Sequence, residues 1–470
     1  MLDKILLVLA ALFIILYRLL FTEPTPENIR MMGILGWVLL VSSMFTWLKR
    51  GNRLVSPYMV FLVVLYLFSF GTPLLYAFSV TPENDLLGFL EINRRGIYES
   101  EWLTLLMLIS FHLGALVYTD KKKNVRQIKD INNFISNKRL ARIGWLLFII
   151  SIYFYVSETI NNLVYSVLYG YAALFEREDS TGLGHLTNFF SELFIPSVIC
   201  LYIAYKDNKL IRYSITTLLL LNIGAIFVIG GRSNGVILLA ILLILRDSLI
   251  KHFSKKEYLG LAIGGLILLS VFSYTATTRN EGGRSFDIKT LEIDDNTIVK
   301  AIAEMGGSQS CLIKTMEFVP KQEDFRYGRT YLFAFTTIIP NLGFWEIHPA
   351  KKEANMSDWL TDKLGLSYGT GFSMCAEAYI NFGYLGPIVF FLFGLLFARI
   401  FGSIELSINI KDYAKLAFLL IIFWFALKLP RNNFIGMVRP FFYYAGPIYL
   451  YCKYGKKKMI VKKKNDTELL

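Results

Sequence analysis

The chain is dominated by apolar stretches long enough to cross a lipid bilayer. A spanning helix needs about 20 mostly apolar residues, because within lipid every backbone polar group must be satisfied inside the protein. The sequence is 54% hydrophobic with a mean hydropathy of +0.48, which excludes an ordinary soluble protein. We therefore predict an all-α polytopic membrane protein. About twelve transmembrane helices are expected, near residues 5–21, 31–48, 57–78, 102–118, 143–156, 188–205, 214–229, 236–250, 258–274, 379–401, 414–427 and 441–452.

Lysine and arginine are concentrated in alternate connections between these stretches. Because basic residues are retained on the cytoplasmic side during insertion, the pattern predicts that both termini are cytoplasmic. We divide the chain into a membrane domain of nine spans (1–274), a large extracytoplasmic segment (275–378, the lid), three further spans (379–452) and a basic cytoplasmic tail (453–470). Lysines facing anionic membrane lipids account for the net charge of +13. A nucleic-acid partner is not expected.

The lid contains two amphipathic patterns and one short apolar run. Apolar residues recur at helical spacing at Ile298, Val299, Ile302 and Met305, and again at Leu312, Ile313, Met316 and Val319. These helices are expected to lie against the membrane domain. The run 331–340 is too short to span and ends in Pro340, which predicts an interfacial or re-entrant helix. Pairing of Cys311 with Cys375 stays open, and two separate buried thiols are favoured.

Several arginines lie near the predicted outer ends of spans. Arg232, in Gly-Gly-Arg-Ser-Asn, stands between two apolar stretches on the side that the charge distribution makes the outer face. Short outer loops normally carry few basic residues, so this arginine needs a reason other than topology. Each such arginine has an alternative role as an anchor whose charged head reaches the interface. The others are Arg279, Arg284, Arg431 and Arg439, with Arg326 and Arg329 further into the lid.

Glu377 is an acid at the start of an otherwise apolar helix. It lies in the run 369–386, flanked by small residues that allow close helix packing. An acid at the edge of the hydrocarbon is costly unless it is paired or faces a wet cavity. We therefore favour a functional site, with an interfacial residue capping the helix as the alternative.

Taken in order, a set of short motifs resembles a known family. Gly-Gly-Arg-Ser lies at 230–233, Thr278-Arg279 follows the next span, Gly-Arg-Thr-Tyr starts at 328, Ile-Pro-Asn at 339, and a longer run covers 371–386. This set looks like the Wzy-type repeat-unit polymerases of bacterial O-antigens and capsules. The resemblance covers the whole topology, and these motifs in detail. It implies a GT-C-like polymerase/ligase architecture in the plasma (inner) membrane.

The resemblance also implies a reaction. A glycosyltransferase of this kind would move a growing glycan from undecaprenyl pyrophosphate to a single repeat unit on the same lipid, at the outer face of the membrane. Its partners would be these lipid-linked glycans and membrane lipids, together with a chain-length regulator and a flippase of the same pathway. No cofactor is expected.

This chemistry needs positive charge at the leaving pyrophosphate and a base at the attacking hydroxyl. Arginine suits the first task because it stays charged and can hold two phosphate oxygens. We assign it to Arg232, Arg279, Arg284, Arg431 and Arg439, and we expect Arg326 and Arg329 to position the glycan. The candidate bases are Glu377 and His348.

A metal site is not expected. Asp294-Asp295 lacks the Asp-x-Asp spacing of nucleotide-sugar enzymes and is typical of a solvated turn.

Two other functions compete with the polymerase. A lipid-linked oligosaccharide flippase or transporter also has many spans, although its two halves are usually similar, which is not the case here. An O-antigen ligase would use the same leaving group and differ only in its acceptor.

Overall fold

The computed structural model describes residues 2–80, 93–122, 133–171, 173–176, 183–261, 263–265, 297–341, 344–366 and 369–453. Within these ranges all regular secondary structure is helical. The predicted all-α fold is thereby confirmed. Four cysteines, including Cys311 and Cys375, are free and buried, as the favoured interpretation had it.

Eight stretches of the described residues are long and apolar enough to cross a membrane, and each coincides with an expected one. The expected stretches 5–21 and 236–250 are also helical, in α1 (Leu2–Leu20) and α11 (Arg232–Leu249). The stretch 258–274 lies largely outside the described residues. A total of twelve spans therefore stays a prediction. The eight are Pro26–Lys49, Pro57–Tyr76, Arg94–Thr119, Asn137–Tyr169, Thr187–Ala204, Lys209–Ile229, Met374–Asn409 and Tyr413–Arg431.

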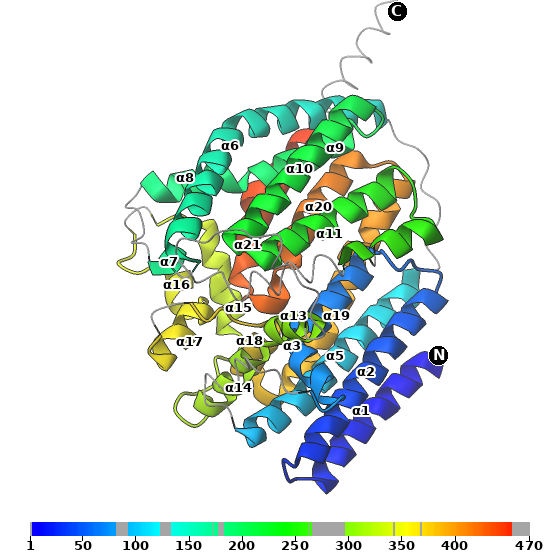
Figure 1. The fold of residues 1–470 in the computed structure, drawn as a ribbon, viewed down its shortest axis with the longest axis vertical. Coiled ribbons are helices and arrows are strands. Elements are labelled where there is room, and N and C mark those ends of the chain that lie inside the picture. Colours follow the sequence, from blue (N-terminus) through cyan, green and yellow to red (C-terminus); the bar gives the residue numbers. More distant parts are fainter. Residues whose placement is uncertain are drawn as a thin grey trace, which may run out of the picture.

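A first bundle occupies the lower right part of Figure 1. It contains α1, α2 (Pro26–Lys49), α3 (Pro57–Tyr76), α5 (Arg94–Lys122) and α19 (Gly386–Asn409). Helices α2 and α3 begin in the same way, with a hydroxyl cap followed by proline in the first turn. Thr25 Oγ1 accepts from the Asn28 N–H at 3.3 Å, and Ser56 Oγ accepts from the Met59 N–H at 3.3 Å.

Glycines let α5 and α19 approach each other closely. A Cβ atom built on Gly394 would lie 1.9 Å from the carbonyl oxygen of Phe111, and one on Gly114 would lie 2.2 Å from that of Phe391. Small residues at such crossings allow backbone-to-backbone packing, which is a main source of helix association in membranes. The same device brings the lid onto the bundle, because a Cβ on Gly306 would lie 2.1 Å from the Thr72 backbone nitrogen.

A second bundle forms the upper part of Figure 1. It consists of α6 (Asn133–Tyr169), α8 (Leu183–Glu192), α9 (Phe194–Ala204), α10 (Lys209–Ile229), α11 and α20 (Tyr413–Ala426), with the short α7 (Ala173–Glu176) beside it. Helices α8 and α9 form one apolar stretch that is broken at Leu193. Helix α10 ends at Gly230, whose φ of +107° is a left-handed conformation that glycine adopts without strain.

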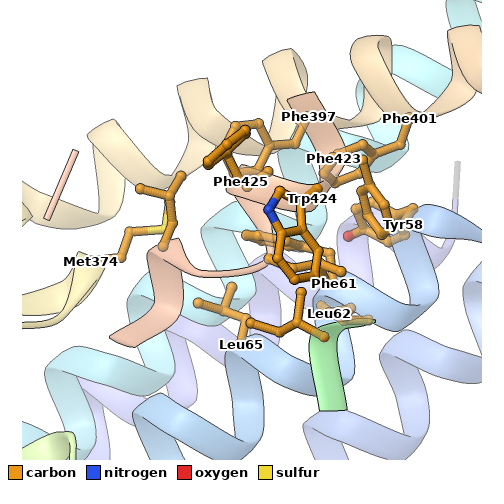
Figure 2. Packing of buried hydrophobic residues seen from close by; sticks show 14 of the residues in the cluster. Tyr58, Phe61, Leu62, Leu65, Met374, Phe397, Phe401, Phe423, Trp424 and Phe425 are labelled. Carbon is orange, nitrogen blue, oxygen red and sulfur yellow. The ribbon is translucent and has the colours of Figure 1, made fainter. Parts of the chain in front are cut away.

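Aromatic packing joins the two bundles (Figure 2). Within the first bundle, the Phe61 ring of α3 meets the Phe397 ring of α19 edge-on, with 4.9 Å between centroids. One turn further along α19, Phe401 meets the Phe423 ring of α20 at 5.0 Å. These side chains are almost fully buried. On the outside of α6, by contrast, Ile149 and Tyr153 are exposed. Apolar surface of this kind is suited to contact with lipid acyl chains.

The described part of the lid is helical and packs on the bundles, as expected. It contains α13 (Thr297–Gly306), α14 (Gln309–Phe318), α15 (Arg329–Ala334), the 3-10 helix η2 (Phe335–Ile338), α16 (Pro349–Glu353) and α17 (Met356–Leu364). Helices α13 and α14 cover the two predicted amphipathic patterns, and α15 with η2 ends before Pro340, as predicted. Helix α18 (Met374–Phe382) and η3 (Gly383–Leu385) then lead into α19.

The chain after α20 is irregular. Residues 428–444, which we call the C-terminal segment, contain the 3-10 helix η4 (Leu429–Arg431), α21 (Ile435–Pro440) and most of the π-helical η5 (Phe441–Ala445). The segment packs against both α20 and the lid, and Tyr443 donates its hydroxyl to the Ile338 carbonyl oxygen at 2.7 Å. Figure 1 shows α21 near its centre, between the second bundle and the lid helices.

Candidate functional site

Glu377 lies in the first turn of α18, with 2% of the residue exposed. Its Oε1 accepts a hydrogen bond from Thr330 Oγ1 at 2.8 Å, and its Oε2 accepts one from the backbone N–H of Phe434 at 2.6 Å. These two bonds offset the cost of burying the carboxyl group. The helix cap is Ser373, whose Oγ accepts from the Ala376 N–H, so the alternative of an interfacial cap at Glu377 does not hold.

Asn381 extends this network by one helical turn. Its Nδ2 donates to Thr330 Oγ1 at 2.7 Å and to the Glu377 carbonyl oxygen at 2.7 Å. Its Oδ1 accepts from the backbone N–H of Gly328 at 2.9 Å. Two of the motifs recognised in the sequence therefore meet here. Through Phe434 the network also reaches the C-terminal segment.

Arg431 and Arg439 lie on either side of Phe434 in the C-terminal segment, and both are exposed. Among the described residues neither guanidinium forms an ion pair, and that of Arg439 lies 5.8 Å from the ring centroid of Tyr443. Two cations without carboxylate partners are thus held on one short segment whose middle is bound to Glu377.

Both ends of the C-terminal segment reach one cavity in the second bundle. The cavity has a volume of about 510 Å³ and lies between α6, α8, α9, α10, α11 and α20. Lys428 lines it directly, and the buried Tyr444 donates its hydroxyl to another lining residue, Glu192. The wall combines polar and aromatic groups. Its other polar members include Glu158, Thr159, Asn162, Asn188, Ser191 and Asn234, and its aromatic members are Tyr155, Tyr171, Trp424 and Phe425.

The Gly-Gly turn before Arg232 lies at the same cavity. Gly231 lines the cavity, and α11 begins at the next residue with no side-chain cap. Free N–H groups and the helix dipole make such a helix start favourable for an anion. The backbone of Arg232 is therefore placed beside the cavity, whereas its side chain lies outside what the structure describes. Arg279 and Arg284 lie outside the described residues.

His348 has hydrogen bonds at both ring nitrogens. Nδ1 accepts from the Ala350 N–H at 3.1 Å and so caps α16, while Nε2 donates to the Ile339 carbonyl oxygen at 3.0 Å. The two bonds fix one neutral tautomer and occupy the lone pair that a base would need. This geometry favours a structural role for His348.

Arg326 and Arg329 hold the lid together. Arg326 pairs with Glu323 at 3.1 Å and lies 3.7 Å from Glu353, while Arg329 pairs with Glu353 at 3.2 Å. Since Glu353 belongs to α16, these pairs tie α15 to α16. Within the described part of the chain, no three His, Cys, Asp or Glu side chains lie together in a way that could hold a metal ion.

The sequence matches the model of the family described as O-antigen polysaccharide polymerase Wzy over residues 4–464. The chain belongs to this family. Comparison with curated proteins and with solved structures gives no match. As a Wzy polymerase, the chain is a multi-pass bacterial inner-membrane protein that joins the repeat units of a polysaccharide.

Sequence reasoning had missed the cavity of this Wzy polymerase. Glu192 is the only acidic or basic residue in the expected span 188–205, which is a signal for a functional residue in a membrane helix. Glu158 and Lys428 lie just past the ends of the spans expected at 143–156 and 414–427, so they passed as loop residues. Helix α6 continues past its apolar stretch to Tyr169, whereas Lys428 follows the end of α20 at Ala426.

Proposed function

We propose that this polymerase uses a glycan on undecaprenyl pyrophosphate as its donor and extends it at the outer face of the plasma membrane, with both termini in the cytoplasm. Nucleotide sugars are not available outside the cell, so the activated bond must arrive on the lipid. The observation that supports this most directly is the C-terminal segment. It bears two arginines that have no carboxylate partner among the described residues, and its two ends reach a polar cavity between apolar helices.

Arg431 and Arg439 are proposed to bind the pyrophosphate, together with Arg232, Arg279 and Arg284. As the sugar leaves the donor, negative charge accumulates on the departing phosphate oxygens, and fixed guanidinium groups stabilise that charge. Arginine stays protonated at every physiological pH, so the arginines can take the place of a metal ion. The reaction is therefore proposed to be independent of metals.

Glu377 and His348 are proposed to position the site. Both oxygens of Glu377 and both ring nitrogens of His348 already take part in hydrogen bonds. Glu377 fixes the C-terminal segment against α15, and His348 fixes the start of α16. Arg326 and Arg329 are proposed to hold the lid in the shape that receives the glycan, through their shared contact with Glu353.

The test uses purified full-length protein in lipid nanodiscs, with lipid-linked repeat units extracted from a polymerase-deletion strain. Wild-type protein is expected to produce a ladder of polymer in the presence of EDTA. Arg431→Ala and Arg439→Ala are each expected to reduce the rate by about 10²-fold, the usual effect of losing one group that stabilises transition-state charge.

Arg399→Ala is the matched control, because Arg399 is also exposed but lies on α19, in the first bundle. It should form polymer at the wild-type rate. Loss of activity in EDTA that is restored by a divalent cation would contradict metal independence. Normal ladders from both Arg431→Ala and Arg439→Ala would contradict the pyrophosphate role. In cells, loss of a polymerase leaves single units outside, whereas loss of a flippase strands them inside.

A further inference from the structure

The cavity in the second bundle is lined by three acidic or basic side chains that belong to apolar spans. Glu158 lies in Asn137–Tyr169, Glu192 in Thr187–Ala204 and Lys428 in Tyr413–Arg431. Charged groups within membrane helices are costly, and they are retained where they face a wet cavity with a function. Helices α6 and α8 and the turn after α20 each contribute such a group to the same space. The cavity is therefore a built site and not a defect in packing.

Glu192 lies where two irregular elements meet. Glu192 is the last residue of α8, at the break that separates α8 from α9. Its hydrogen-bond donor, Tyr444, belongs to the π-helical η5, a type of turn found frequently at functional sites. Broken helices at membrane depth are tolerated where they line a cavity or are enclosed by protein.

Glu192 differs from Glu377 in the state of its oxygens. Oε2 accepts the hydroxyl of Tyr444, which stabilises the carboxylate. Among the described residues Oε1 has no hydrogen-bond partner. Lys428 lines the same cavity as Glu192. Glu192 is exposed at the cavity, and Tyr444 orients its carboxylate through Oε2, which leaves Oε1 accessible to a bound hydroxyl, as a base requires.

The other lining groups suit a carbohydrate. Asn162, Ser191 and Asn234 offer amide and hydroxyl groups that can both donate and accept, as sugar hydroxyls do. Trp424 also lines the cavity, and the ammonium of Lys428 lies 4.8 Å from the centroid of its ring. The volume of about 510 Å³ lies within the roughly 300–1,000 Å³ of small-molecule sites.

We propose that this cavity binds the acceptor sugar and that Glu192 accepts the proton of its attacking hydroxyl. The inference rests on the proposed function, because it needs a donor with a pyrophosphate leaving group. The hydroxyl oxygen forms the new bond to the anomeric carbon of the donor, its proton moves to Glu192 Oε1, and the bond to the pyrophosphate breaks. The electron pair of that bond leaves with the lipid pyrophosphate. Tyr444 positions Glu192, and Glu158 binds the acceptor.

The experiment measures acceptor kinetics with full-length protein in nanodiscs. The donor is the lipid-linked repeat unit. The acceptor is the same repeat unit as an alkyl glycoside, which has no leaving group and cannot act as a donor. Glu192→Gln is expected to lower kcat by about 10²–10⁴-fold, the usual contribution of a general base, with little change in acceptor KM. Glu158→Gln should raise the acceptor KM and keep kcat, and Tyr444→Phe should lower kcat less than Glu192→Gln does.

Unfolding temperatures of the variants separate chemistry from folding. Glu192→Gln keeps the size of the side chain and an oxygen for Tyr444, so it should unfold at the wild-type temperature. A Glu192→Gln protein with wild-type kcat refutes the inference, as does a loss of kcat that appears in Glu158→Gln instead. If wild-type protein leaves the repeat units unjoined, the proposed function fails as well. An active wild type with an equally active Glu192→Gln refutes the inference alone.

Discussion

Replacing Glu377 tests whether this carboxylate stabilises the structure of the site or takes part in the glycosyl-transfer reaction. Glu377 accepts one buried hydrogen bond from Thr330 and one partly buried hydrogen bond from the backbone of Phe434. A hydrogen bond to a charged group contributes about 1.5–3 kcal/mol, and removing one partner leaves the other unsatisfied. Glu377→Ala deletes both acceptors, so we expect it to lower the free energy of unfolding by about 3–5 kcal/mol.

Glu377→Gln should cost less. The amide oxygen can still accept from Phe434, but its NH2 group cannot accept from the Thr330 hydroxyl. The Thr330 hydroxyl oxygen has two lone pairs, so it can accept a hydrogen bond from the new NH2 group in addition to the one from Asn381. The Thr330 hydroxyl proton, however, loses its acceptor. We therefore expect Glu377→Gln to lower the free energy of unfolding by about 1–2 kcal/mol. Activity should fall in proportion to stability.

The assay is thermal unfolding of purified protein together with polymer synthesis at a temperature where each variant is folded. Glu346→Ala is the control, because Glu346 is exposed and forms no ion pair among the described residues. It should change stability by less than about 0.5 kcal/mol. A double mutant of Glu377→Ala with Thr330→Val should be less destabilised than the sum of its parts. If the Glu377→Gln protein unfolds at the wild-type temperature but makes no polymer, Glu377 does not act by stabilising the site, and its carboxylate takes part in the reaction.

Three further predictions concern packing, pH and capping. Gly394→Ala should prevent accumulation of folded protein, because the new Cβ would collide with the Phe111 carbonyl oxygen at 1.9 Å; membrane yield measures this. Partial burial alone would raise the pKa of Glu323, but the ammonium of Lys363 and its other donors hold that pKa below the ordinary value. The resulting stability is present above the unfolded pKa and is lost as pH falls through the folded pKa, so wild-type and Glu323→Gln unfolding temperatures should converge in acid. His348→Ala should cost about 1 kcal/mol of stability through loss of the α16 cap, whereas His348→Asn should restore both stability and polymer synthesis.

Each of these has a result that would contradict it. Gly224 has no atom within 4 Å of its would-be Cβ, so Gly224→Ala should accumulate normally, and equal yields of the two glycine variants would exclude the close crossing. If the difference in unfolding temperature between wild type and Glu323→Gln stayed constant across the pH range, a contribution of the Glu323 charge to stability would be excluded. An inactive but fully stable His348→Asn would point to proton transfer by the imidazole.

Much of the fold could be predicted because bilayer thickness and helix periodicity act locally. The lengths of apolar stretches located the spans, and the 3.6-residue period located α13 and α14. Pro340 stops the short apolar run, since proline cannot continue a helix. The ends of helices were less predictable. Polar turns carry α6 past the apolar stretch, so Glu158 lies inside a helix and not in a loop.

The site could be predicted only in part, because it depends on which helices meet. The acidic residue at 377 and the Gly-Arg-Thr motif at 328 were visible as separate features. Their connection through Asn381, and the hydrogen bond from Phe434, depend on tertiary packing that no local pattern encodes. The cavity draws its wall from helices throughout residues 155–428, so its composition becomes visible only once the chain is folded.

The C-terminal segment connects Glu377 to the cavity that contains Glu192. These two acids have different roles, which one carboxylate could not combine. A carboxylate that holds two buried donors is a good structural acceptor and a poor base, because protonation would break the bonds that define the site. Glu377 has this arrangement. A base needs an oriented carboxylate with a free oxygen, as at Glu192. Because Phe434 lies between Lys428 and Tyr444 in the chain, displacement of the segment at Glu377 should disturb both arginines and Glu192 together. Variants of Glu377 and Glu192 should therefore differ in kind, the first lowering stability and activity in parallel, the second lowering kcat alone.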